Sequence, residues 1–141
     1  MKRLALMLAL WWPVVALADI EPGNWEFTVN TTARGLGGLG PKPGPAVSTR
    51  CITADQASNP GKVLSDAGAR GECELSNQQD TGSEFSVDLS CKGRVPLRGS
   101  AKMRYTAQTM DGSIDLDGEV QGMQFSTRSQ ISARRLGPCT P

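Results

Sequence analysis

The side chains in this sequence that could move protons are mainly carboxylates, because the chain contains no histidine. Asp115, Asp117 and Glu119 occupy alternate positions, which would place all three on one face of a β-strand. Paired carboxylates carry out glycoside hydrolysis, so this spacing leaves a carboxylate-dependent hydrolase open as an alternative function. The absence of histidine excludes Ser-His-Asp and Cys-His hydrolysis and histidine-ligated metals.

An exposed, solvated sheet face explains these carboxylates better than an active site does. We expect basic neighbours for them on that face, namely Arg98, Lys102, Arg104 and Arg128. The segment 111–116 begins like a calcium loop, but Leu116 stands where such a loop needs glycine. We therefore predict no catalytic residue and no metal site, and we expect the protein not to be an enzyme.

The four cysteines, Cys51, Cys73, Cys91 and Cys139, are the other candidates for chemistry. No two of them have the C-x-x-C spacing of a zinc site, and no histidine is present to complete a mixed site. A reactive thiolate would need a nearby base. We therefore expect two disulfides, which form in oxidising compartments outside the cytosol.

Residues 33–45 have the glycine- and proline-rich composition of a mobile loop. Within them, residues 35–40 match the dinucleotide fingerprint G-x-G-x-x-G. That fingerprint needs a helix to begin at the glycines, whereas three prolines follow here. We therefore predict no cofactor and interpret the segment as a flexible hairpin loop. Leu36 and Leu39 leave open a role as a lid or as a partner contact.

Residues 1–18 have the three-part pattern of a cleaved secretory signal. Lys2 and Arg3 precede an apolar run, and Ala16-Leu17-Ala18 supplies small residues at the expected cut. The run is shorter than the ~18 apolar residues that a membrane span needs, and no cysteine follows the cut to carry a lipid. We therefore predict cleavage after Ala18, a periplasmic location and no stable membrane anchor.

The remaining residues, 19–141, have the size of one domain. They contain 13 basic and 14 acidic residues once Lys2 and Arg3 are removed. Such a balance argues against a partner that is held mainly by charge. We therefore expect neither nucleic acid nor an anionic membrane surface as a partner.

Three consecutive antiparallel strands are predicted over residues 97–131. Asp111-Gly112 is a strong signal for a two-residue turn, and it would place Tyr105 opposite Gly118. Gln121-Gly122 would form the next turn. A slip of one residue would move the aromatic residues to the polar face, so the alternation of apolar and polar residues favours this register.

The first part of the chain predicts two strands and one short helix. Residues 24–32 alternate apolar and polar residues, and residues 46–52 form the second strand. Thr53 and Gln56 have the spacing of a capping box, so a helix should begin there. It should end near Asn59-Pro60, because the residue before a proline is pushed out of the helical region.

A further hairpin is predicted from residues 72–79 and 84–91, with a turn centred on Gly82. This turn would place Gln79 opposite Phe85 and continue the pairing down both strands. The hairpin adds two strands to the predicted sheet, and each strand carries one cysteine.

The same hairpin predicts how the cysteines pair. Cys73 lies directly opposite Cys91, at a separation that a disulfide can bridge after a local twist. Cys51 and Cys139 then pair by elimination. This second bridge would tie the predicted helix to the C-terminal end of the chain.

These elements predict an all-β fold: an antiparallel meander of about seven strands, in a strongly curved sheet or partly open barrel, with one short helix after the second strand. Apolar residues along one side of the meander would form either a filled core or a cleft for an apolar ligand. The possible apolar ligand face comprises Trp25, Phe27, Phe85, Met103, Tyr105, Met123 and Phe125.

The leading functional hypothesis is non-catalytic binding of an apolar small molecule, or of an envelope protein, in the concave face of the sheet. A second hypothesis is an envelope accessory protein that acts by protein–protein contact. Its contact surface would be an edge strand near Trp25 or the loop 33–45.

Four segments carry a resemblance to a known family. They are Pro22-Gly23-Asn24-Trp25-Glu26, Arg50-Cys51-Ile52-Thr53, Ser90-Cys91-Lys92-Gly93 and Arg134-Arg135-Leu136-Gly137-Pro138-Cys139. Together they resemble domain-of-unknown-function family 3617 over nearly the whole of residues 19–141. The resemblance implies a small exported bacterial protein with four similarly spaced cysteines. It carries over no catalytic residue, because that family has no established activity. Many relatives look rich in methionine where loop 33–45 is rich in glycine and proline, which argues against a methionine-based metal site.

Overall fold

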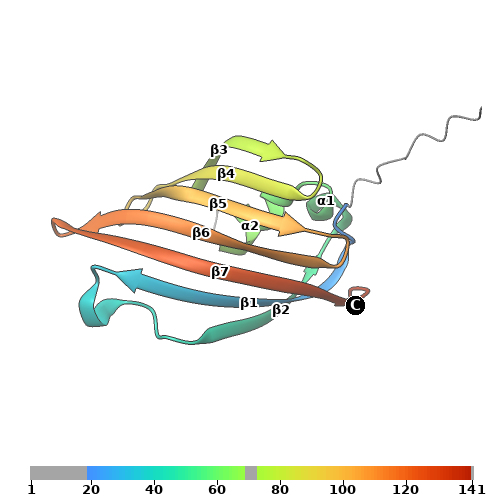
Figure 1. Ribbon diagram of the computed structural model, residues 1–141, viewed down its shortest axis with the longest axis horizontal. Coiled ribbons are helices and arrows are strands. Elements are labelled where there is room, and N and C mark those ends of the chain that lie inside the picture. The colour runs from blue at the N-terminus through green and yellow to red at the C-terminus, as the bar shows by residue number, and fades with distance from the viewer. Residues whose placement is uncertain (1–18, 69–72, 141) are drawn as a thin grey trace, which may run out of the picture.

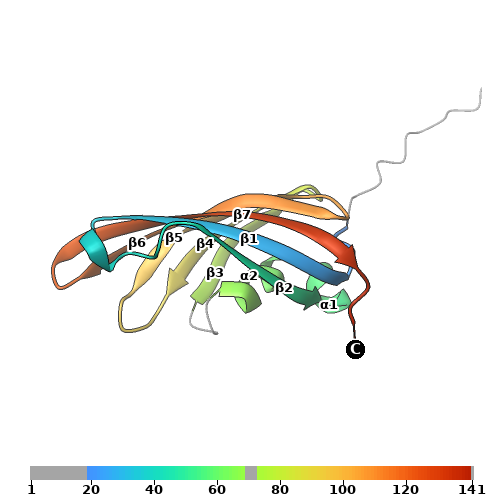
Figure 2. The ribbon, with the colours of Figure 1, turned by 90° about the horizontal axis from the view of Figure 1, so that it is seen from below.

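The computed structural model describes residues 19–68 and 73–140, so the predicted signal and its cut after Ala18 lie largely outside the described residues. Seven antiparallel strands form one sheet, and two short helices lie on one side of it (Figures 1 and 2). In chain order the elements are β1 (Gly23–Arg34), the 3-10 helix η1 (Gly37–Leu39), β2 (Pro45–Ile52), α1 (Ala54–Ala57), α2 (Pro60–Gly68), β3 (Cys73–Asp80), β4 (Glu84–Cys91), β5 (Leu97–Tyr105), β6 (Thr109–Val120) and β7 (Met123–Gly137).

The strands follow one another as a meander, with one long-range pairing between the first and last strands. The order across the sheet is β2-β1-β7-β6-β5-β4-β3, so β2 and β3 are the edge strands and the sheet is open. The predicted curved meander is confirmed. The expected edge strand near Trp25 is β2, whose Arg50 lies opposite Trp25; β1, which carries Trp25, pairs with β2 on one side and β7 on the other.

Two helices follow β2, where the sequence predicted one. The capping box is confirmed: the Thr53 hydroxyl accepts from the Gln56 backbone N–H, and the Gln56 side chain accepts from the Thr53 N–H. After α1 ends, Pro60 opens α2. Proline suits the first position of a helix, where no backbone N–H is needed. The predicted stop at Asn59-Pro60 is therefore followed directly by a second helix.

The predicted β5–β6 turn at Asp111-Gly112 is wrong. The chain turns earlier, at residues 106–109, and Tyr105 lies opposite Met110 rather than Gly118. The Thr106 hydroxyl accepts hydrogen bonds from the backbone N–H groups of the next residues in this turn, Gln108 and Thr109. This side-chain bonding stabilises the turn without glycine.

The wrong turn still placed the side chains on the correct faces. Tyr105 pairs eight positions away from the expected residue, and an even displacement leaves the alternation of faces unchanged. The next turn, Gln121-Gly122, is confirmed by positive φ at both residues and by the pairing of Val120 with Met123. Asp115 lies opposite Arg128, as expected.

The β3–β4 hairpin joins Cys73 to Cys91 in a disulfide, as the sequence predicts. The expected pairing of Gln79 with Phe85 is wrong, because Gln79 lies opposite Ser86. An irregularity between Ser76 and Gln79 shifts the register there, and Asn77 in this stretch has a φ of 51°. At the other end of the hairpin, Cys73 lies opposite Cys91, as predicted.

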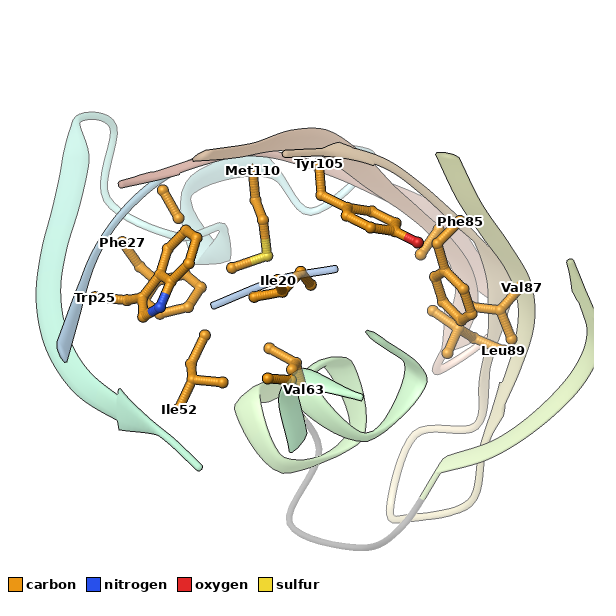
Figure 3. Close-up of a cluster of buried hydrophobic side chains, with 13 residues drawn as sticks. Ile20, Trp25, Phe27, Ile52, Val63, Phe85, Val87, Leu89, Tyr105 and Met110 are labelled. Atoms are coloured by element: carbon orange, nitrogen blue, oxygen red, sulfur yellow. The ribbon is translucent and has the colours of Figure 1, made fainter. Parts of the chain in front are cut away.

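The sheet is strongly curved (Figure 2). Its buried apolar side chains lie on the concave side (Figure 3). Figure 3 shows the sheet arching over the buried cluster, with α2 on the opposite side and Ile20 between them. Trp25, Ile52 and Val87 are the largest fully buried side chains. The core thus occupies the space between the arch and the helices.

Candidate ligand-binding cleft

An apolar cleft of about 630 Å³ lies on the concave side of the sheet. Its volume falls in the range of about 300–1,000 Å³ that is typical of small-molecule sites. The sheet supplies apolar side chains from its inner strands, and residues 92–95 between β4 and β5 form part of the wall. Representative apolar lining residues from the sheet are Val29, Leu89, Leu97, Ile114, Leu116 and Ile131.

Strand alternation explains why these side chains share one face. In β6, Met110, Ile114 and Leu116 occupy alternate registers and all line the cleft. In β7, Ser129 and Ile131 do the same. Side chains two positions apart in a strand project to the same side, so β6 presents an apolar stripe to the interior and β7 presents Ser129 and Ile131.

The predicted ligand face is brought together only in part. Phe27, Met103 and Tyr105 line the cleft. Trp25 and Phe85 do not line it; their exposed fractions are 0% and 3%, so they belong to the core.

The other two predicted members lie near the β6–β7 turn, outside the cleft. Met123 begins β7 and is 52% exposed, and Phe125 packs beside Gly118. The inner face of the sheet extends beyond the cleft. A residue can therefore lie on the predicted face of the sheet and still be outside the cleft, as Met123 and Phe125 are.

Sequence reasoning missed the wall supplied by α2. Val63 is buried and Leu64 packs against the core, and both line the cleft with Pro60. The signal that could have found this wall was the adjacent pair Val63-Leu64 after a helix-opening proline. Sequence reasoning also missed Arg50, which shares the inner face of β2 with Ile52, two residues away.

Tyr105 is the titratable aromatic residue of the cleft wall. Its hydroxyl donates a hydrogen bond to Asp80 Oδ1 at 2.5 Å, and its side chain is largely buried. Burial, together with the Asp80 carboxylate, raises the pKa of the Tyr105 phenol. The phenol therefore stays protonated at neutral pH and acts as a hydrogen-bond donor.

Three cationic side chains, Arg50, Lys92 and Arg94, also line the cleft. Lys92 Nζ lies 2.8 Å from the Glu74 carboxylate, which raises the pKa of the lysine. The Arg50 guanidinium lies over the Phe27 ring, 5.4 Å from its centroid. No carboxylate is found among the described residues that line the cleft. The site is therefore apolar with positive charge at its boundary.

The carboxylates singled out from the sequence do not line this cleft. Asp115, Asp117 and Glu119 occupy the registers of β6 that alternate with the cleft-lining ones, so they project to the convex face. Asp115 Oδ1 lies 2.9 Å from Arg128 Nε. Asp115 and Asp117 border a separate polar hollow of about 320 Å³.

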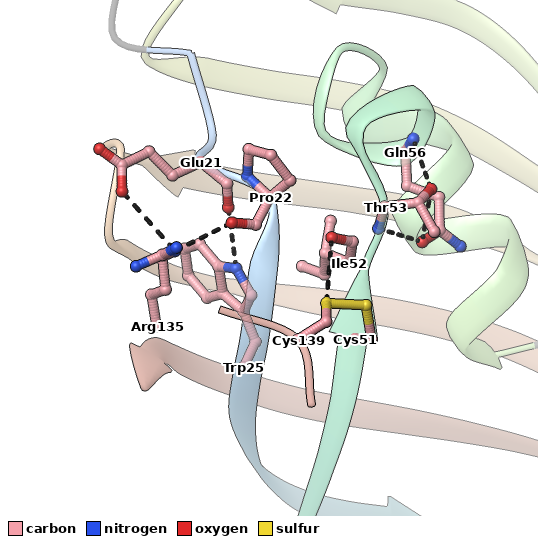
Figure 4. Close-up of a disulfide and its surroundings, with 9 residues drawn as sticks. All are labelled: Glu21, Pro22, Trp25, Cys51, Ile52, Thr53, Gln56, Arg135 and Cys139. Atoms are coloured by element: carbon pink, nitrogen blue, oxygen red, sulfur yellow. Dashed lines mark hydrogen bonds and ion pairs between the residues drawn. A yellow bond between two sulfur atoms is a disulfide. The ribbon is translucent and has the colours of Figure 1, made fainter. Parts of the chain in front are cut away.

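The residues just before β1 contact β7, and the C-terminal residues contact β2 (Figure 4). Trp25 Nε1 donates to the Glu21 carbonyl at 3.0 Å, and Arg135 Nε donates to the Pro22 carbonyl at the same distance. The predicted Cys51–Cys139 disulfide joins the C-terminal residues to β2. These contacts fix the strands that carry one side of the cleft.

Comparison with known proteins identifies one family. A family model described as "Protein of unknown function (DUF3617)" matches residues 20–139. No curated protein and no solved structure matches the chain. The matched segment includes the whole sheet and both disulfides.

In residues 19–68 and 73–140, none of the helices has the length and apolar character that crossing a bilayer requires.

Proposed function

Because the chain belongs to domain-of-unknown-function family 3617, its activity has to be inferred from its own site, and we propose that it is an exported, non-catalytic protein that binds an apolar ligand in the concave cleft. The observation that carries this proposal is the apolar cleft of about 630 Å³ under the arch of the sheet.

The chemistry of the cleft wall supports an apolar occupant. Its side chains are mainly aliphatic and aromatic, and removing such surface from water is favourable by about 25 cal/mol per Å². A hydrocarbon chain gains about 0.8 kcal/mol for each methylene that it buries. The serines of the wall, Ser48, Ser65 and Ser129, supply a few polar groups that would orient a ligand.

Export is supported by the sequence pattern of residues 1–18 and by the two disulfides. Disulfides persist in oxidising compartments such as the bacterial periplasm. We therefore propose a periplasmic location, in which a cleft of this kind would hold an apolar compound away from water.

The binding test uses an apolar fluorescent probe and a variant with a blocked cleft. Ile114→Trp places a larger side chain on the cleft wall. The matched control is Val47→Trp on β2, where the native side chain is 62% exposed and outside the cleft. We expect saturable binding to the parent and to Val47→Trp, and at least fivefold weaker binding to Ile114→Trp. Circular dichroism and disulfide mapping establish that both variants fold.

The second readout is the mass of the native protein. Protein expressed with residues 1–18 and purified from the periplasm should carry a bound lipid-like species in native mass spectra. Protein that is free of ligand and ignores the apolar probe, or that binds the probe equally well in all three forms, overturns the proposal.

A carboxylate-dependent hydrolase is the competing proposal from another class. The triple variant Asp115→Asn, Asp117→Asn, Glu119→Gln separates the two, because these residues lie outside the cleft. If the cleft carries the function, the triple variant binds the apolar probe as the parent does and complements a deletion strain. A stable triple variant that fails in complementation while binding the probe normally would favour the hydrolase.

Contact with an envelope protein is a second candidate, favoured by exposed apolar side chains at one edge. Leu39 in η1 is 86% exposed and Val47 on edge strand β2 is 62% exposed. The informative variant is Leu39→Ser, which leaves intact the pairing of β1 with β7. Loss of a specific cross-linked partner in this variant, with probe binding unchanged, would support this candidate.

A further inference from the structure

The charged side chains that line the cleft are all cationic, and the carboxylates of Glu74 and Asp80 contact the lining residues Lys92 and Tyr105 from outside it. Arg50, Lys92 and Arg94 line it, and the described lining residues include no aspartate or glutamate. The chain as a whole is almost balanced in charge, with 15 basic and 14 acidic residues. The bias therefore belongs to the site and not to the composition.

Three cations on the sheet outside the cleft are paired with carboxylates. Arg104 pairs with Asp111, Arg128 with Asp115, and Arg134 with Glu26. Within residues 19–68 and 73–140, no such ion pair involves Arg50 or Arg94. Two guanidinium groups of the cleft wall therefore have no carboxylate partner in this part of the chain.

Arg50 is the better placed of these two arginines to hold a ligand. It lies opposite Trp25 in the β1–β2 pairing, and its guanidinium is positioned over the Phe27 ring at 5.4 Å from the centroid. Contact with the ring face supports the flat guanidinium. Its in-plane N–H groups can then bind two oxygens of one anionic group.

We propose that the ligand is an amphiphile with an apolar chain and one anionic head group, a carboxylate or a phosphate. The chain lies along the apolar wall, and Arg50 holds the head group, with Arg94 as a second cation. This inference rests on the proposed function and adds the chemical class of the ligand. Positive charge without a carboxylate in the lining favours an anionic ligand and disfavours a cationic one.

The test compares ligands with the same chain and different head groups. Dodecanoate, dodecyl phosphate, dodecanol and dodecyltrimethylammonium each compete, below their micellar concentrations, with the apolar probe. We expect the anionic compounds to bind about tenfold more tightly than dodecanol and the cationic compound to bind most weakly. The first two ligands distinguish a carboxylate head group from a phosphate.

The variant Arg50→Gln should remove most of the anion preference, which is measured as the ratio of the affinity for dodecanoate to the affinity for dodecanol in the same variant. Arg50→Lys should restore part of it, because lysine keeps the charge but loses the planar pair of donors. The matched control is Arg134→Gln, which removes an exposed arginine paired with Glu26 outside the cleft. Arg94→Gln should reduce the preference less than Arg50→Gln does.

The outcomes separate this inference from the proposed function. Binding of dodecanol with no preference for the anions overturns the inference and leaves the apolar site intact. An anion preference that survives Arg50→Gln overturns the assignment of the head group to Arg50. Failure of every chain to bind overturns the proposed function itself.

Discussion

Arg135 donates a hydrogen bond from Nε to the backbone carbonyl of Pro22 at 3.0 Å, and so connects the last strand to the segment that precedes the first. Its guanidinium also lies 3.6 Å from the Glu21 carboxylate, and its side chain is only 22% exposed. Arg135 and Pro22 both lie in segments that carry the family resemblance. These segments therefore hold β7 against the residues that precede β1, which is a structural role.

Replacing Arg135 should destabilise the protein more than replacing its neighbour. Arg135→Gln leaves the Pro22 carbonyl with a weaker partner, and we expect a loss of about 1–2 kcal/mol. Arg134→Gln breaks an exposed ion pair with Glu26, which is worth about 0–1 kcal/mol. Urea midpoints of the two variants measure the difference. Equal midpoints would contradict the role assigned to Arg135.

Gly99 should not tolerate even a methyl group. A Cβ at this position would lie against the backbone carbonyl of Asp115 on the neighbouring strand. Backbone cannot move aside as a side chain can, so Gly99→Ala should cost at least about 2 kcal/mol. Gly38→Ala is the matched control, because nothing lies within 4 Å of its added Cβ. Thermal unfolding of both variants tests the contrast, and a neutral Gly99→Ala would refute it.

The pKa of Tyr105 predicts a loss of stability at alkaline pH. Burial and Asp80 raise the pKa of this phenol in the folded protein above the value of about 10 for an unfolded tyrosine. Above pH ~10 the unfolded chain loses the proton while the folded protein keeps it, so stability falls as pH rises. The contribution of this group is complete below that pH.

Tyr105 is the single tyrosine of the chain, so its ionisation can be followed directly by ultraviolet absorbance. We expect tyrosinate to form in the native protein only well above pH ~10, and near that pH in urea. Tyr105→Phe should show a smaller loss of stability between neutral and alkaline pH than the parent. A native titration that overlays the titration in urea would contradict the buried hydrogen bond to Asp80.

The two disulfides should contribute unequally to stability. Cys51–Cys139 spans a sequence separation of 88 residues and Cys73–Cys91 one of 18. In the chain-entropy model the longer loop restricts the unfolded state more, by about 1.4 kcal/mol. Paired Cys→Ser variants of each bridge, compared by urea unfolding, measure this difference. A larger loss from the shorter bridge would show that loop entropy is not the main contribution.

The fold was predictable from the alternation of apolar and polar residues along the strands, although the turn between β5 and β6 was predicted at the wrong residues. Asp111-Gly112 has the composition of a hairpin turn, but Gly112 lies within β6, where an added Cβ would contact the backbone of Lys102. The hydroxyls of Thr106 and Thr109 stabilise the real turn. Because the displacement was even, Tyr105 still faces the interior.

The cleft was predictable only in part, because local patterns do not give the path of the chain across the sheet. The alternation of side chains along the strands correctly predicted that Phe27, Met103 and Tyr105 line the cleft. How far α2 reaches over the sheet depends on tertiary packing, so Leu64 was not expected in the wall. The position of Arg50 required the register of β1 with β2, which no turn signal in loop 33–45 specifies.

The most direct test of the anionic-amphiphile cleft is a titration followed at the methionine methyl groups. Met103 and Met110 line the cleft, whereas Met123 lies outside it and is 52% exposed. Protein labelled with ¹³C at the methionine methyls, with resonances assigned by Met→Leu variants, would be titrated with dodecanoate and observed by NMR. We predict saturable shifts of Met103 and Met110 with Met123 unchanged, and weaker binding in Arg50→Gln. Shifts at Met123 alone, or no shift at Met103 and Met110, would contradict the account.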